Sequence, residues 1–339
     1  MILSSNPRTP AFWKPPVTVA PGGGERVVGV ELEFAGLEME AIAEVITGVY
    51  GGRLEKTDVW SGRVCGTSLA EFGDFAIELD AALLKEGKLE RYLTKLGVER
   101  AETFSSVEDF VARSARHVVP MEIVAPPVPV GRLPEIEQLR AALHASAAKD
   151  TRASVFHAFG THLNAEAPSF EAAEIRDVLR AFLILYDWLK EKLEVDLSRR
   201  LTPFIDPFPR DYARLVLAPD YAPDLDTLIR DYLRHNPTRN RPLDALPLFA
   251  HLREAVVFEG FKPKLVSPRP AYHYRLPNCS LNDPAWTLAA EWNRWVVVER
   301  VAADKERLGH LAEERLRWLD HPAQVVAGRI AEKVREWFA

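Results

Sequence analysis

The sequence has few cysteines, no long apolar run and no excess of positive charge. Two cysteines in 339 residues, Cys65 and Cys279, make neither a disulfide framework nor a thiolate zinc site, which favours a reduced, cytoplasmic setting. No apolar stretch approaches the roughly 20 residues that span a bilayer, and residues 1–14 lack the apolar segment of a secretory signal. A formal net charge of −6 argues against nucleic acid and anionic membranes as partners.

What is present is typical of a soluble globular protein, with 47% hydrophobic and 27% charged residues. Residues 1–26 are rich in Pro and Gly and predict an extended N-terminal arm. We expect residues 27–339 to form a single domain, with a Pro-rich, partly helical insertion at about 196–268. The three glycines at 22–24 precede a strand and lack a following Lys-Ser/Thr, so they do not indicate a phosphate loop.

Two carboxylates, Glu31 and Glu33, lie in a segment with the pattern of a strand, residues 26–34. Because side chains alternate along a strand, both acids point to one face while the apolar residues point to the other. Neighbouring carboxylates repel each other and need a counter-ion, either Arg/Lys or a divalent metal. Oxygen ligands favour Mg²⁺ or Mn²⁺. The alternative is the solvated face of an antiparallel sheet, where Glu is common.

The same pattern recurs along the chain. Two further strand candidates contain acids, at alternate positions or within an apolar run: Glu78 and Asp80 in 75–80, and Glu122 in 119–125. A third candidate, 155–166, places His162 and Asn164 on one face, and arginines flank a late one: Arg269 and Arg275 around 271–276. In one sheet, they would supply the components of phosphoryl chemistry, since carboxylates hold metals and arginines neutralise transferred charge. A hydrogen-bonded core role for His162 and a structural ion pair for Arg275 are the alternatives.

The predicted strands are polar on one face, which favours an antiparallel sheet with helices on one side over a parallel sheet covered on both sides. We therefore predict an α+β fold with five to six strands. The strands are 26–34, 75–80, 119–125, 155–166 and 271–276, with a strand or hairpin within 53–65. Helical spacing predicts helices within 38–50, 82–97, 105–116, 133–147, 169–193, 224–234, 244–253, 284–316 (broken) and 322–338.

Four motifs carry a family resemblance: Gly-Val-Glu-Leu-Glu-Phe at 29–34, Met-Glu-Ile-Val-Ala-Pro-Pro at 121–127, Phe-Gly-Thr-His-Leu-Asn-Ala-Glu at 159–166 and Tyr-Arg-Leu-Pro-Asn at 274–278. In this order they resemble the amidoligase family, which is similar to glutamine synthetase and the glutamate–cysteine ligases. The resemblance runs from about residue 27 to 300.

The resemblance implies a glutamine-synthetase-like catalytic domain that uses ATP and Mg²⁺ to join a carboxylate to an amine through an acyl phosphate. It implies metal ligands at Glu31, Glu33, Glu78 and Glu122, a metal- or nucleotide-binding His162, and phosphate contacts from Arg269 and Arg275. Asp80 and Asn164 match less closely, and Asn278 would orient a substrate or close a turn. The substrates would be an amino acid, peptide, polyamine or protein tail.

Two other functions use the same residues. A metal-dependent hydrolase would need the carboxylates but no nucleotide, and a non-catalytic binding or scaffold protein would keep the sheet without turnover. Relatives of glutamine synthetase often form rings or dimers, and a homo-oligomer is compatible with this sequence, although no feature demands one.

Overall fold

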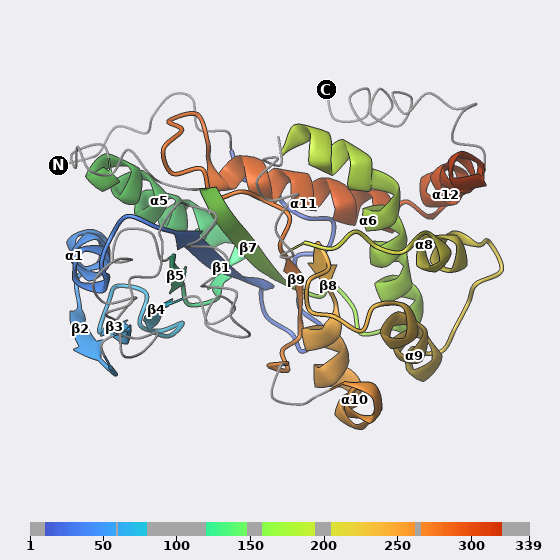
Figure 1. Cartoon of the computed structure of the whole chain (residues 1–339), viewed down its shortest axis with the longest axis horizontal. Helices are drawn as coiled ribbons and strands as arrows, with labels where there is room; N and C mark the ends of the chain where they lie inside the picture. The colour runs from blue at the N-terminus through green and yellow to red at the C-terminus, as the bar shows by residue number, and fades with distance from the viewer. Residues whose placement is uncertain are drawn as a thin grey trace, which may run out of the picture. The chain divides into compact units, whose positions relative to one another are not determined.

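The computed structural model describes residues 11–58, 60–79, 120–147, 158–193, 205–261 and 266–320 (Figure 1). Within these ranges the chain forms eight α-helices and a nine-stranded sheet with the order β2-β3-β4-β5-β1-β7-β9-β8, in which β6 pairs with β1. The α+β prediction is confirmed, but the expected five to six strands were too few. The additional strands come from a complete hairpin, β2–β3, and from two strands of only two residues each, β6 and β8.

The strands are β1 Val27–Phe34, β2 Arg53–Lys56, β3 Ser61–Cys65, β4 Phe75–Leu79, β5 Met121–Val124, β6 Val128–Pro129, β7 Ala158–Glu166, β8 Leu243–Asp244 and β9 Ala271–Tyr274. The helices are α1 Met39–Tyr50, α5 Leu133–Ala147, α6 Ala172–Lys192, α8 Arg210–Leu217, α9 Leu225–His235, α10 Leu246–Gly260, α11 Leu288–Ala303 and α12 Lys305–Asp320, with a 3₁₀ turn at Val130–Arg132.

The expected strands and the helices that fall on described residues are all present, with shifts of up to about seven residues at their ends, the largest at the end of α10. The broken helix expected at 284–316 is two helices, α11 and α12. One helix, α8, was not predicted, because prolines surround it. Pro209 immediately precedes α8, where a missing N–H has no helical partner to lose. The helices expected at 82–97, 105–116 and 322–338 lie outside the described residues.

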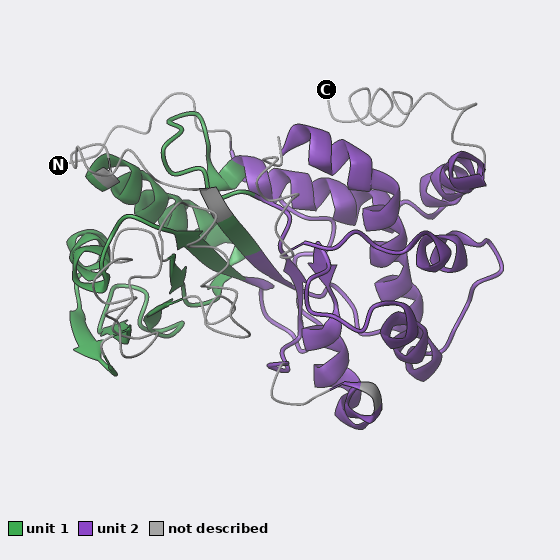
Figure 2. Cartoon of the chain, viewed as in Figure 1, with its two compact units in different colours: residues 1–10, 29–162, 278–289 green, residues 11–28, 163–277, 290–339 purple. Residues whose placement is uncertain are grey.

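The chain divides into two compact units (Figure 2). Unit 1 includes Gly29–His162 and Asn278–Ala289, and unit 2 includes Ala11–Val28, Leu163–Pro277 and Ala290–Ala339. Each unit therefore combines segments that are distant in sequence, and β1, β7 and α11 each contribute residues to both units.

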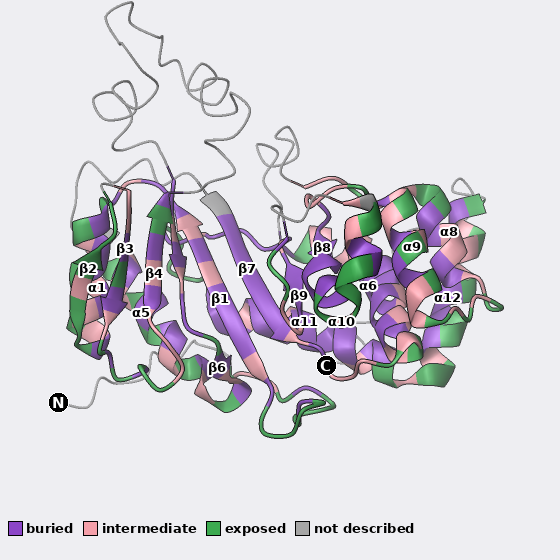
Figure 3. Ribbon diagram, turned by 90° about the horizontal axis from the view of Figure 1, so that it is seen from below, coloured by how far each residue is buried: buried purple, intermediate pink, exposed green. Residues whose placement is uncertain are grey.

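The strands of unit 1 bury one face and leave the other more exposed. Along β1, Val30, Leu32 and Phe34 are buried, whereas Glu31 and Glu33 are half-buried, and the alternation is visible in Figure 3. The neighbouring strands β4 and β5 follow the same rule. Helix α1 contacts β2, β3, β4 and α5. The hydrophobic alternation thus directs the acids away from the apolar core.

A tight connection joins α1 to the β2–β3 hairpin. Gly52 has φ of +88°, and a Cβ placed there would lie 2.5 Å from the carbonyl oxygen of Cys65. Only glycine tolerates both the left-handed backbone and this close approach.

Unit 2 has an aromatic core. Phe182, Tyr212, Tyr232 and Phe249 are fully buried, and Tyr212 and Tyr232 pack edge to face with centroids 5.7 Å apart. Helices α6, α8 and α12 contact one another, and α10 contacts α9 and β9.

None of the helices in the described part of the chain has the length and apolar character that crossing a membrane requires.

Candidate active site

Three glutamates form a row across the sheet of unit 1. The antiparallel register pairs Glu78 of β4 with Glu122 of β5, and Glu122 with Glu33 of β1. Three of the four predicted metal-ligand acids therefore lie side by side on the face opposite the apolar core. Like charges directly opposite each other destabilise a sheet, so this row requires compensating positive charge. We call Glu33, Glu78 and Glu122 the acid row.

His162 of β7 lies against both acids of β1. Its Nδ1 is 2.7 Å from Oε2 of Glu31, and its Nε2 is 3.3 Å from Oε1 of Glu33. The side chains are 4%, 12% and 14% exposed for His162, Glu31 and Glu33, respectively. The structure thus brings together the predicted histidine and the predicted Glu-x-Glu pair, and it partly removes them from water.

The ligand atoms of Glu33, Glu122 and His162 lie within 4.8 Å of one another. This spacing allows one ion to contact all three side chains. The donor set is two carboxylates and one imidazole. Mg²⁺ is coordinated by oxygen ligands such as the carboxylates, and Mn²⁺ is coordinated by both oxygen and imidazole nitrogen. The residues therefore fit a hard divalent cation.

The backbone around this cluster is fixed from two sides. The N–H of Gly160 donates to Oε2 of Glu33 at 2.9 Å, which holds that carboxylate in place. Gly160 also forms an isolated antiparallel bridge with Asn278, whose carbonyl accepts a hydrogen bond from the hydroxyl of Thr161 at 3.3 Å. The backbone of Asn278 therefore pairs with the start of β7.

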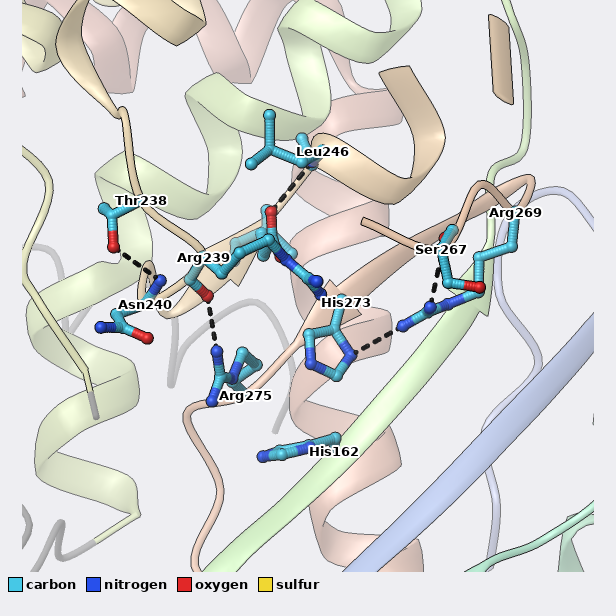
Figure 4. Close-up of polar contacts among 12 residues, drawn as sticks. His162, Thr238, Arg239, Asn240, Leu246, Ser267, Arg269, His273 and Arg275 are labelled. Atoms are coloured by element: carbon cyan, nitrogen blue, oxygen red, sulfur yellow. Dashed lines mark hydrogen bonds and ion pairs between the residues drawn. The ribbon is translucent and has the colours of Figure 1, made fainter. Parts of the chain in front are cut away.

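In unit 2, Asn164 holds the predicted Arg269. The Nε and Nη2 atoms of Arg269 donate to Oδ1 of Asn164 at 3.1 and 2.7 Å. The same oxygen lies 2.9 Å from Nδ1 of His273, its register partner on β9. Nη2 of Arg269 also lies 3.3 Å from Nδ1 of His273, a contact marked by a dashed line in Figure 4.

The other predicted arginine, Arg275, follows β9 and contacts a loop. Its Nη1 donates to the carbonyl oxygen of Arg239 at 2.5 Å (Figure 4). Arg239 in turn donates through Nε to Oδ2 of Asp244 on β8 at 2.6 Å. The structure thus gives Arg275 a contact with the backbone of this loop.

Three residues near the arginines were missed by the sequence reasoning: Arg239, Asp244 and His273. His273 had a signal, because it alternates with the buried Tyr272 and Tyr274 and so shares a face with Arg275. Arg239 and Asp244 lie in or next to a loop without periodicity, and no pattern marked them. Asp80, a weaker match to the metal ligands, lies outside the described residues.

A sequence model of the family described as "putative amidoligase enzyme" matches residues 24–297. The chain belongs to this family. The match confirms the amidoligase resemblance and indicates an enzyme that forms amide bonds. No curated protein and no solved structure matches the chain.

Proposed function

We propose that this amidoligase is an ATP- and Mg²⁺-dependent carboxylate–amine ligase that works through an acyl phosphate. The observation that carries the proposal is the convergence of Glu33, Glu122 and His162, whose ligand atoms lie within 4.8 Å of one another. A ligase of this class must neutralise phosphate charge during transfer, and divalent metals and arginines do so in phosphoryl-transfer enzymes.

Glu33, Glu122 and His162 would hold the metal, with Glu31 orienting His162 through its 2.7 Å contact and Glu78 extending the acid row. The metal, when bound, supplies positive charge to the phosphate oxygens. The contact from the Gly160 N–H keeps the Glu33 carboxylate directed into the cluster. Mg²⁺ and Mn²⁺ are both compatible with this donor set.

The chemistry has two steps. First, a carboxylate oxygen of the acid substrate attacks the γ-phosphorus of ATP, the bond to the ADP oxygen breaks, and an acyl phosphate forms. Second, the amine nitrogen attacks the acyl carbon, inorganic phosphate leaves, and the nitrogen loses its proton. Arg269, held by Asn164, and Arg275 would contact the oxygens on which charge accumulates. The acid is an amino acid, a peptide or a protein tail, and the enzyme acts in the cytoplasm.

An assay for coupled products tests this function. The protein is incubated with Mg²⁺-ATP, hydroxylamine as the amine, and mixtures of amino acids or short peptides as the acids. We expect ADP and hydroxamate in equal amounts, both dependent on the acid. Glu33→Gln should lower the rate at least about 100-fold, as expected for the loss of a charge-stabilising group.

Glu44 provides the matched control, because it is exposed on α1 and Glu44→Gln removes the same charge. That variant should retain the full rate. Undiminished turnover by Glu33→Gln would refute the assignment of the cluster. Neither ADP nor hydroxamate with any acid, together with no binding of ATP, would instead favour the hydrolase or the non-catalytic alternative.

A further inference from the structure

Within unit 2, helix α11 holds residues 11–13 by their main chain, and we call these residues the docked segment. The side-chain amide of Asn293 accepts the N–H of Trp13 at 2.8 Å and donates to the carbonyl oxygen of Ala11 at 2.9 Å. The indole N–H of Trp292 donates to the carbonyl oxygen of Trp13 at 2.8 Å. In an extended chain, main-chain groups two residues apart point to the same side. These contacts therefore match the hydrogen-bonding edge of an extended peptide.

The side chain of Trp13 adds a fourth contact. The guanidinium of Arg300 lies over the ring of Trp13, 4.6 Å from its centroid. Arg300 follows Asn293 by seven residues, which is two helical turns, so both side chains lie on one face of α11. A cation–π contact requires an aromatic ring at this position of the peptide. Helix α11 thus recognises the main chain of the docked segment and one aromatic side chain.

The polar groups of α11 that make these contacts are buried. Asn293 is 8% exposed and Trp292 is 1% exposed. Within the described ranges, the hydrogen bonds of the Asn293 side chain go to the docked segment alone. A buried amide costs free energy unless its donor and acceptor are paired, so the helix needs a peptide main chain at this place. Asn293 therefore indicates a site that serves peptide binding and not a wider polar network.

The chain that follows the docked segment is mostly exposed. Of residues 14–19, only Pro15 is buried, and Val17 and Val19 are 42% and 58% exposed. A second attachment comes at Val17, whose carbonyl oxygen accepts a hydrogen bond from Nη1 of Arg26 at 2.7 Å. A segment with few buried apolar contacts opens at a smaller free-energy cost than the unfolding of its domain. The docked segment is therefore suited to leave α11 while Arg26 stays in place.

We infer that α11 carries a docking site for an extended peptide with an aromatic residue, and that residues 11–13 of the same chain occupy it as a detachable segment. The site recognises main-chain N–H and C=O groups through Asn293 and Trp292, and the aromatic ring through Arg300. When the chain's own segment is displaced, the site accepts the same peptide from solution. The inference is independent of the proposed reaction, because none of these residues belongs to the candidate active site.

Binding of a synthetic peptide to the full-length protein tests the inference. An acetylated peptide of residues 11–18, labelled with fluorescein at its C-terminus, is titrated with the unaltered protein and with Trp13→Pro, and fluorescence anisotropy is measured. Proline removes the N–H that Asn293 accepts and the ring that Arg300 contacts, so the variant's own segment leaves the site. A tethered segment has an effective concentration of about 1 mM. For a peptide Kd of about 0.1 mM, the unaltered protein should therefore bind the peptide about tenfold more weakly than Trp13→Pro.

Matched variants of the peptide and of the site provide the controls. A peptide with Lys14→Ala, which changes an exposed neighbour of Trp13, should bind the Trp13→Pro protein as tightly as the original peptide. A peptide with Trp13→Pro should not bind. The double variant Trp13→Pro/Asn293→Leu should not bind the original peptide. The Trp13→Pro protein should unfold cooperatively, with a melting temperature close to that of the unaltered protein, because the segment detaches without unfolding unit 2.

Four results would overturn the inference. The first is no peptide binding by a folded Trp13→Pro protein, and the second is equal binding by the unaltered protein and by Trp13→Pro. The third is loss of the fold in Trp13→Pro, which would make the segment an integral part of unit 2. The fourth is a dimer that requires Trp13, which would place the segment on a second copy of the chain. The peptide with Trp13→Pro tests the same contacts without altering the protein, and its binding would also contradict the inference.

Discussion

Glu122 is the central residue of the acid row, with Glu78 on one side and Glu33 on the other in the sheet register. Carboxylates on neighbouring strands repel one another, which is the expected cost of the proposed metal site. His162 contacts Glu33 of this row and also Glu31. A functional cluster of this kind is expected to cost stability when it is empty.

Glu122→Gln should therefore leave the metal-free protein as stable as before or more stable. Relief of the cross-strand repulsion contributes about 0.2–1 kcal/mol. The same variant should lose the stabilisation that Mg²⁺ together with a non-hydrolysable ATP analogue gives the unaltered protein. Urea unfolding with and without these two ligands measures both effects, and Glu44→Gln is the control. A large loss of stability without metal would show that Glu122 has a structural role instead.

A different residue pair supports the fold of unit 2. Arg26 and Glu299 form a bidentate pair at 2.6 and 2.8 Å, and their side chains are 1% and 3% exposed. Arg26 also donates to the carbonyls of Val17 and Glu166, and Trp295 donates to Glu299 at 2.7 Å. The pair thus connects the segment before β1 with β7 and α11.

Glu299→Gln keeps an acceptor for Trp295 but leaves the charge of Arg26 buried without its counter-ion. We expect a loss of about 3–5 kcal/mol in the free energy of unfolding, measured in urea. The comparison variant is Glu55→Gln, which breaks an exposed pair with Arg53 and should leave the midpoint unchanged. Equal midpoints for Glu299→Gln and the unaltered protein would contradict the importance of the buried pair.

Strand alternation was the signal in the sequence that identified most of the candidate site residues. Glu31 and Glu33 share a face two residues apart, and Glu78, Glu122, His162 and Asn164 follow the same rule within their own strands. The alternation could not reveal register, so the alignment of Glu78, Glu122 and Glu33 appears only in the structure. Arg239 was unpredictable because its place depends on a buried partner in a strand of two residues.

At the scale of elements, α6 and α12 are joined by an ion pair. Nη1 of Arg315 lies 2.7 Å from Oδ2 of Asp187, and Lys190 contacts the same carboxylate at 2.7 Å. Burial raises the pKa of Asp187, but the positive charges of Arg315 and Lys190 outweigh this effect, so the pKa lies below its ordinary value. The pair therefore stabilises the contact of the two helices at neutral pH.

This pKa direction fixes the sign of a pH dependence. Because the folded-state pKa is depressed, the stabilisation is present above the unfolded pKa and is lost as the pH falls through the folded pKa. Asp187→Asn should be less stable than the unaltered protein at pH 7, and the difference should shrink as the pH approaches 3. Urea midpoints at several pH values measure this, with Asp226→Asn as an exposed control. A difference independent of pH would contradict the prediction.

Elements with strong periodicity were predicted well, and short or proline-flanked ones were not. The long amphipathic segments became α1, α5, α6 and α9 almost residue for residue. Strands β6 and β8 have two residues each, too few for an alternating pattern, and exist because neighbouring strands supply their hydrogen bonds. Helix α8 was not predicted because the flanking prolines were interpreted as helix breakers. Proline is also favourable at the start of a helix, and Pro209 lies there.

On the scale of the whole molecule, each unit carries its own row of polar residues on the sheet. Unit 1 has the acid row, and unit 2 has the row of Asn164, His273 and Asp244, in which Asn164 contacts Arg269 and Asp244 contacts Arg239. The expectation of one domain over residues 27–339 stays a prediction, as does the homo-oligomer.

The most direct test of the account is thermal unfolding of the purified protein with Mg²⁺, with a non-hydrolysable ATP analogue, and with both together. A ligand that binds only the native state stabilises it by about 2.7 kcal/mol at a concentration 100 times the Kd, and this stabilisation raises the melting temperature. We predict a large increase only with both ligands, and its loss in Glu33→Gln. No increase at saturating concentrations of both would contradict the ligase account.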